Sequence, residues 1–249
     1  MNTLSLPETA TPDASPASTK PAARGPGRGL GALLIADALL SFAPVVVLGA
    51  AIGWPASLDH PAAEQLAAIH ANAGMVTLGY GLYLLYSILI APVMAGLAAR
   101  AFGGLQHPLA MTMAAFGALS ALARAIGILR WLTVMPMLAT AHAAADPTAR
   151  TQIELVFNAV NEFGGGIGEI LGVSLFMALS MGALGVAAWR RAALPRWLAA
   201  SAVVVAAALA ALALPAFRID LHMPVALAVS MLSLWMLAAG VWLLRERRG

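Results

Sequence analysis

The sequence predicts an all-α integral membrane bundle of six transmembrane helices, with the N- and C-termini cytoplasmic. Apolar residues make up 61% of the 249 residues and charged residues only 10%, whereas a soluble domain has roughly 45–50% and about 25%. Apolar stretches of about 20 residues, the length of a helix that crosses a bilayer, recur along the chain. Lysine and arginine residues gather in alternate connections between these stretches, which indicates the cytoplasmic side.

The apolar stretches predict six spans, at residues 30–53, 74–98, 108–134, 153–188, 198–217 and 224–244. The third and fourth are longer than a bilayer requires. The third can therefore continue as a helix past Pro136 beyond the membrane, and the fourth can begin or end in water. Residues 60–72 are expected to form a short surface helix, because Pro61 suits a first turn and Leu66 and Ile69 can lie against the membrane.

The basic residues set the orientation and the domain limits. Ten lysines and arginines fall on the side of the two termini, and only Arg150 and Arg218 fall on the other side. Residues 1–29 are rich in Pro, Ala, Ser and Thr and lack an apolar run, so they are expected to be a disordered cytoplasmic tail before a transmembrane domain at residues 30–249. The formal charge of +3 is too small for a nucleic-acid surface, so the lipid bilayer is the expected partner.

Span four carries the polar residues around which the chain is organised. With about 100° per residue, Asn158, Glu162 and Glu169 fall on one face of a helix, opposite an apolar face. A charge at the bilayer centre costs at least ~3 kcal/mol, so this face must look into the protein. Small residues recur at every fourth position, a pattern that lets a neighbouring helix approach closely: Gly164, Gly168 and Gly172. Span four is therefore expected in the middle of the bundle.

Depth in the membrane indicates which acid meets the arginines of span three. At ~1.5 Å per residue, Arg124 lies about 15 Å from the outer end of its span and Glu162 about 14 Å from the outer end of span four. We therefore expect Arg124 and Glu162 to form an ion pair; the alternative is that such a pair only fixes helix register. Arg130 lies nearer the outer surface and can extend to it. Small and polar residues share the stripe of Arg124: Gly117, Ser120, Gly127 and Trp131.

Two acids have no cation at their depth. Asp37 of span one and Glu169 fall in the inner half of the membrane, where an unpaired carboxyl group is expected to hold a proton. They are candidate proton-binding residues. Tyr80 and Tyr83 of span two share a face at the depth of the expected ion pair, where a phenol can donate to a carboxylate; the alternative is a bond to a backbone carbonyl.

No metal or cofactor is expected. The five histidines fall at the membrane borders, without the i, i+3 or i, i+4 spacing of ligands on one helix: His60, His70, His107, His142 and His222. Surface histidines are the favoured interpretation. The sequence also lacks G-x-S-x-G, H-E-x-x-H and a phosphate-binding glycine loop between a strand and a helix.

Two runs of sequence suggest a family. ARAIGILRWL at residues 123–132 and NEFGGGIGEILG at residues 161–172 resemble the bacterial six-helix membrane proteins grouped as domain-of-unknown-function family four-three-eight-six. The resemblance covers roughly residues 29–244. It implies a six-span fold in a bacterial inner membrane, points to Arg124, Arg130 and Glu169 as residues to test, and implies no activity.

For function, the sequence favours a small-ligand or proton-linked carrier or receptor with an intramembrane Arg/Glu site. The expected ligand- or proton-binding residues are Arg124, Glu162, Glu169, Asp37, Asn158, Tyr83 and Arg130. The alternatives are a non-transporting scaffold or partner subunit, or a membrane enzyme that uses Glu162 and Glu169 as acid and base. A carrier needs a water-filled cavity at Glu169 that opens to each side of the membrane in turn, and an enzyme needs one persistent opening to its substrate. A scaffold needs no such cavity.

Overall fold

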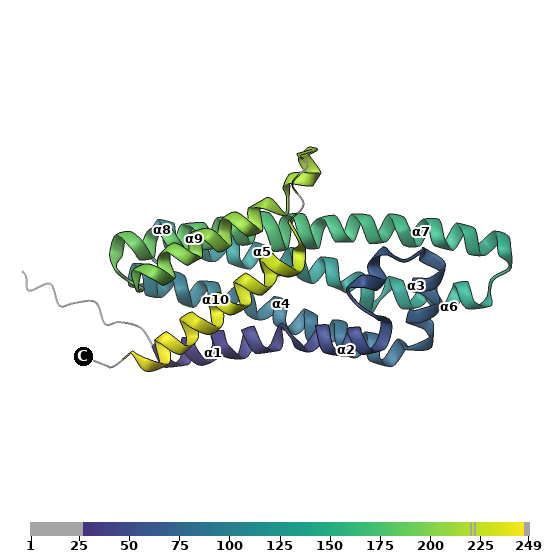
Figure 1. Cartoon of the computed structure of the whole chain (residues 1–249), viewed down its shortest axis with the longest axis horizontal. Coiled ribbons are helices and arrows are strands. Elements are labelled where there is room, and N and C mark those ends of the chain that lie inside the picture. Colours follow the sequence, from purple (N-terminus) through teal and green to yellow (C-terminus); the bar gives the residue numbers. More distant parts are fainter. Residues whose placement is uncertain (1–26, 220, 222, 247–249) are drawn as a thin grey trace, which may run out of the picture.

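The computed structural model describes residues 27–219, 221 and 223–246, and within these ranges the chain folds into helices without a strand (Figure 1). The expected disordered tail, residues 1–29, lies outside the described residues up to position 26, and α1 begins at Gly27. In chain order the elements are α1 (Gly27–Leu40), α2 (Ala43–Ile52), η1 (Ala56–Asp59), α3 (Ala62–Ala71), α4 (Ala73–Phe102), α5 (Pro108–Leu132), α6 (Val134–Ala144), α7 (Pro147–Gly165), η2 (Gly166–Phe176), α8 (Met177–Arg191), α9 (Arg196–Ala211), η3 (Leu214–Phe217) and α10 (Val225–Arg245).

Five helical segments of the described chain are long and apolar enough to cross a membrane: Gly27–Ile52, Ala73–Phe102, Pro108–Ala144, Pro147–Arg191 and Val225–Arg245. The predicted fifth span, residues 198–217, is not among them, because its helix α9 has only 16 residues; five of the six predicted spans are thus long enough in the described chain. At ~1.5 Å per residue this helix is about 24 Å long, less than the ~30 Å of a bilayer core. The apolar run continues beyond Ala211, but Pro215 lacks the N–H that a continuing helix needs, and a 3₁₀ turn follows instead.

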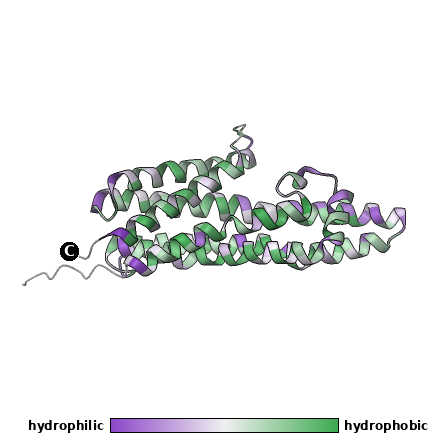
Figure 2. Ribbon diagram, turned by 60° about the horizontal axis from the view of Figure 1, so that its bottom comes forward, coloured by the Kyte–Doolittle hydropathy of each residue, from purple (hydrophilic) through white to green (hydrophobic). Residues whose placement is uncertain are grey.

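The elements divide between the two ends of a long bundle. α3, α6 and the start of α7 lie at one end, called here the hairpin end, and the start of α1, the end of α10 and the α8–α9 turn lie at the other, the termini end (Figure 1). Hydrophilic residues gather at both ends, and hydrophobic residues dominate the length between them (Figure 2). The described ends of the chain thus lie on the same side of the bundle.

Each end has its own buried cluster. The larger cluster packs α8, α9 and α10 against α1, α4 and α5, and the smaller one packs α3 and α6 against α2, α4, α5 and α7. Leu66 and Ile69 of α3 are 0% and 1% exposed and belong to the smaller cluster. The expected helix at residues 60–72 is therefore present, but these two side chains point into the protein and not toward the membrane.

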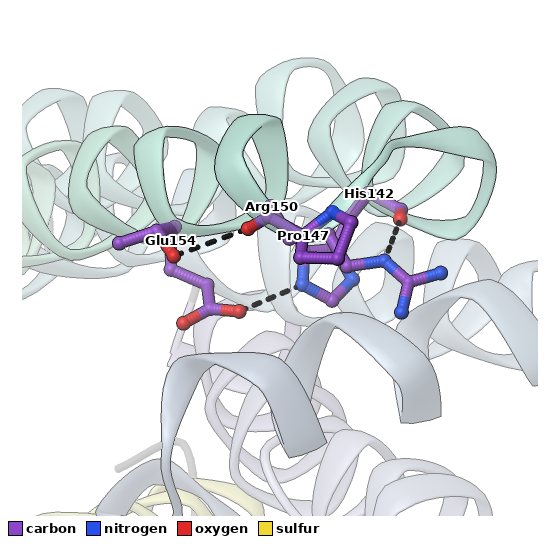
Figure 3. A network of polar contacts seen from close by, with 5 residues as sticks. His142, Pro147, Arg150 and Glu154 are labelled. Atoms are coloured by element: carbon purple, nitrogen blue, oxygen red, sulfur yellow. Dashed lines mark hydrogen bonds and ion pairs between the residues drawn. The ribbon is translucent and has the colours of Figure 1, made fainter.

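The α6–α7 hairpin extends the third and fourth spans at the hairpin end. α6 continues α5 after Thr133, as the length of the third span predicted. The Asp146 carboxylate caps α7 by accepting hydrogen bonds from the backbone N–H groups of Thr148 and Ala149 at 2.9 and 3.0 Å. Behind the cap, His142 Nε2 lies 2.8 Å from Glu154 Oε1, and Arg150 Nε donates to the His142 carbonyl at 3.2 Å (Figure 3). These contacts tie the two helices together at the tip.

The segment with the densest glycines is a π-helix. η2 interrupts the long helix Pro147–Arg191 over eleven residues, Gly166–Phe176, where an α-helix was expected. A π-helix bonds i to i+5; it is rare and occurs frequently at functional sites. Because its turns hold more residues than α-helical turns, positions beyond Gly166 face other directions, and lie at other depths, than α-helical spacing predicts.

Glycine contacts fix α5 against η2. A Cβ atom on Gly127 would lie 2.8 Å from Gly168 Cα and 2.9 Å from the Gly164 carbonyl oxygen. One on Gly172 would lie 2.9 Å from the backbone nitrogen of Arg124. The expected close approach at the glycine ladder is therefore confirmed, and the partner helix is α5.

This packing predicts a large effect at Gly127. The Gly127→Ala substitution should lower the free energy of unfolding by about 1–3 kcal/mol, because the added methyl meets backbone atoms that cannot rotate away. Gly81→Ala on α4 is the matched control, since a Cβ there meets nothing within 4 Å. The thermal unfolding midpoint of the Gly81→Ala variant should equal or exceed that of the wild type in the same detergent. Equal midpoints for the two variants would contradict the close α5–η2 contact.

Candidate functional site

A cavity of about 60 Å³ lies between α4, α5 and η2 on the hairpin side of the bundle. This volume exceeds the roughly 10–15 Å³ that one buried water molecule needs. Three charged side chains line the cavity, Arg124, Arg130 and Glu169, together with the aromatic rings of Trp54, Tyr80, Tyr83 and Trp131. Four of the predicted site residues therefore meet here: Arg124, Arg130, Glu169 and Tyr83.

Arg124 is the most deeply buried charge of the cavity. Its side chain comes from the middle of α5 and is 2% exposed. Nη1 donates to Tyr86 Oη at 2.9 Å, and the guanidinium carbon lies 5.7 Å from the centre of the Tyr86 ring. Within the described residues, Nε and Nη2 are buried and have no hydrogen-bond partner. Two donors of a buried cation are therefore unused.

The predicted ion pair between Arg124 and Glu162 is wrong. Arg124 lies beside Gly172, ten residues and more than two helical turns beyond Glu162 in the chain. The prediction took residues 134 and 153 as the outer ends of the two spans, whereas the helices run on to Ala144 and start at Pro147. Glu162 and the predicted site residue Asn158 are exposed on α7 and do not line the cavity.

Arg130 is held against α7 and does not extend away to a surface. Its Nε and Nη2 donate to Asn161 Oδ1 at 3.3 and 3.2 Å, and Nη1 donates to the Gly127 carbonyl. The aliphatic part of the side chain packs on Gly164, where a Cβ would lie 2.6 Å from Arg130 Cδ. Glycine at position 164 thus makes the space in which this arginine reaches the cavity.

Glu169 is not isolated from cations, in contrast to the prediction. It lines the same cavity as both arginines and interacts electrostatically with Arg130. Its side chain is exposed, whereas Arg124 and Tyr80 are each 2% exposed. Glu169 therefore lies at the edge of the cavity and Arg124 at its closed part. The bulge of η2 brings Glu169 to this level, and α-helical counting could not show it.

Asp37 lies outside the cavity. It is 0% exposed on α1, and neither carboxylate oxygen has a hydrogen-bond partner among the described residues. Arg124 acts on it electrostatically. The structure thus does not bring Asp37 and Glu169 together as one proton-binding pair, although Arg124 acts electrostatically on Asp37 and lines the same cavity as Glu169.

Aromatic rings form much of the cavity wall. Tyr80 stacks on Trp131 with ring centres 4.7 Å apart, and Trp54 packs edge-on against Tyr83 at 6.2 Å. The Tyr80 hydroxyl is buried without a partner in the described part of the chain. The phenol that contacts Arg124 is that of Tyr86, where Tyr80 and Tyr83 were expected at this depth.

Three residues contribute to the site that the sequence did not predict there. Trp131 belongs to the predicted stripe of Arg124, so its helical spacing was the available signal. Tyr86 follows Tyr83 by three residues, which places it on a neighbouring part of the same helix surface. Trp54 has no signal in the sequence, because it reaches the cavity only through the way the connection after α2 folds back.

Comparison with known proteins gives a match to a family. The family described as Domain of unknown function (DUF4386) matches residues 30–246, which include every residue of the cavity. Neither the curated proteins nor the solved structures give a significant match. The chemistry of the site must therefore be argued from its geometry.

A pair of double-mutant cycles distinguishes the partners of Arg124. Tyr86→Phe and Arg124→Gln should show a coupling energy of about 1.5–3 kcal/mol, since a hydrogen bond to a charged group is lost. Glu162→Gln should change stability by less than about 0.5 kcal/mol, as expected for an exposed side chain, and should not couple to Arg124→Gln. The measurement is chemical or thermal unfolding of the four variants of each cycle. Coupling only in the Glu162 cycle would restore the ion pair that the structure replaces.

Proposed function

The chain belongs to the family described as Domain of unknown function (DUF4386), and we propose that it is a multi-pass membrane protein that binds a small anionic ligand in the Arg124 cavity. The family is the one that the two short runs of sequence predicted. The proposed roles are those of a receptor or a proton-linked carrier in a bacterial inner membrane. Arg124 and Arg130 would hold the anionic group, and Glu169 would exchange a proton.

The unused donors of Arg124 carry the proposal. A buried polar group without a hydrogen bond costs about 1–3 kcal/mol, and more if it is charged. Arg124 has two such donors, Nε and Nη2, and the Tyr80 hydroxyl of the same cavity is also unpartnered in the described chain. A carboxylate or another oxyanion supplies the acceptors that these groups lack, and the planar guanidinium fork suits its two oxygens.

Charge and shape support the same class of ligand. The cavity holds two cations and one acid, so it is positive by one charge when Glu169 is ionised and by two when Glu169 is neutral. Its volume of about 60 Å³ admits only a compact group. The rings of Tyr80 and Trp131 offer an apolar face to the body of a small organic anion.

The connection after α2 indicates the direction of entry. Trp54 and Leu58 of this connection line the cavity, so the ligand would enter from the hairpin end. The distribution of lysine and arginine predicts that this end faces away from the cytoplasm. A receptor needs this one entrance only, whereas a carrier must also open toward the termini end in a second conformation. Uptake of the anion by proteoliposomes that contain the protein is expected for a carrier and not for a receptor.

The first functional prediction concerns Arg124. The purified full chain is titrated with a panel of small carboxylates and inorganic oxyanions by calorimetry. Arg124→Gln should weaken binding at least about 100-fold, because hydrogen bonds to a charged group contribute roughly 1.5–3 kcal/mol each. The same variant should unfold at the same or a higher temperature than the wild type without ligand, because it removes a buried charge with unused donors.

A control separates this effect from the loss of any positive charge. Arg150→Gln removes an exposed arginine at the tip of the α6–α7 hairpin, away from the cavity lining. It should leave anion affinity within about threefold. If both variants bind the panel as the wild type does, or if the wild type binds none of the panel, Arg124 is not an anion-binding residue for these ligands and the proposal fails.

The second functional prediction concerns Glu169 and pH. A proton on Glu169 removes a negative charge beside the anion, so proton binding and anion binding must strengthen each other. Wild-type affinity for an anion whose own charge is constant should therefore rise as the pH is lowered. Glu169→Gln should bind at least as tightly as the wild type and lose most of this pH dependence. An unchanged pH profile in Glu169→Gln would remove the proton-linked part of the proposal and leave the anion site.

A further inference from the structure

A second hollow lies at the termini end, far from the Arg124 cavity. It has a volume of about 150 Å³ and runs between α8 and α9. Its lining is apolar apart from Arg190, and includes Val186, Trp189, Ala200 and Val203. We call it the α8–α9 groove. Its side chains are open to the outside, with Val186 47% and Val203 45% exposed.

Cations gather where the groove reaches the end of the bundle. Arg190 lines the groove near the end of α8, and Arg196 begins α9 after the short connection between the helices. The Arg196 guanidinium carbon lies 5.9 Å from the centre of the Trp189 ring, which also lines the groove. In the described part of the chain, no carboxylate lies within 4 Å of either arginine. Their charges are thus available to an anion from outside.

The flanking tryptophans place this junction at a membrane surface. Trp189 and Trp197 are 54% and 58% exposed, one on each helix. Exposed tryptophan is typical of the bilayer interface, where the ring lies at the level of the lipid headgroups. The groove therefore runs from the headgroup level into the hydrocarbon region.

We propose that the α8–α9 groove binds an anionic phospholipid. The phosphate would lie between Arg190 and Arg196, and one acyl chain would lie on Val186, Ala200 and Val203. A phospholipid complements both parts, whereas a free phosphate leaves the apolar groove empty and a neutral lipid leaves two cations without a counter-charge. Basic residues between transmembrane helices are a known recognition mode for such headgroups. This site is independent of the anion cavity and of the proposed function.

Lipid retention tests the proposal on the intact chain. The delipidated protein is incubated with phosphatidylglycerol or phosphatidylcholine, and bound lipid is counted by native mass spectrometry. The wild type should prefer phosphatidylglycerol at least about tenfold. Arg190→Gln with Arg196→Gln should reduce the preference to near unity, because each basic residue near an anionic lipid strengthens binding by about fivefold. Arg190→Lys with Arg196→Lys should keep most of it.

Two controls address the headgroup and the groove separately. Arg150→Gln with Arg218→Gln removes the same charge at exposed positions elsewhere, and should leave the preference intact. Ala200→Trp fills the groove without changing the charge, and should lower retention of both lipids at this site. Inorganic phosphate at millimolar concentration should not displace the lipid. Equal retention of the two lipids by the wild type, or an equal loss in the Arg150/Arg218 control, would overturn the proposal.

Discussion

The contact between α5 and η2 determines the rest of this structure. Gly127 and Gly168 bring two backbones together so closely that no side chain fits between them. This contact sets the register of the two helices, and through it the relative depths of Arg124, Arg130 and Glu169. Arg124 is placed beside Gly172, Arg130 beside Gly164, and Glu169 beside the cavity between them. The charged site is therefore a consequence of backbone packing, not of charge pairing.

That origin explains why the site is incompletely satisfied. An ion pair would have neutralised Arg124, but the glycine register brings no carboxylate within 4 Å of it among the described residues. Tyr86 supplies one acceptor and the face of its ring, which offset part of the cost of burying the cation. Two donor atoms remain without a partner in the described chain, on a side chain that lines the cavity. Ionisable side chains inside transmembrane segments are rare and commonly mark binding sites or pathways.

Features that depend on composition and on the spacing of nearby residues could be predicted from the sequence. The membrane class, most of the helices, the family, the glycine ladder and the stripe of Arg124 could all be predicted, because each depends on residues close in the chain. The depths of Arg124 and Glu169 in the membrane could not be predicted. They depend on where α6 and α7 end and on the eleven π-helical residues of η2, and neither α-helical periodicity nor hydropathy distinguishes a π-helix from an α-helix. Trp54 enters the site through a folded-back connection, which is a tertiary feature.

The short α9 helix has a consequence for the surrounding lipid. Its ~24 Å length leaves a hydrophobic mismatch of about 6 Å with an ordinary bilayer core. The connection that follows projects from the side of the bundle (Figure 1) and exposes Phe217, Ile219 and Leu221, at 64%, 51% and 46%. A short hydrophobic helix is accommodated by local thinning of the bilayer, and these apolar side chains suit contact with the acyl chains beside it. The protein thus meets a membrane of unequal thickness around its circumference, and thinner membranes reduce the deformation that it imposes.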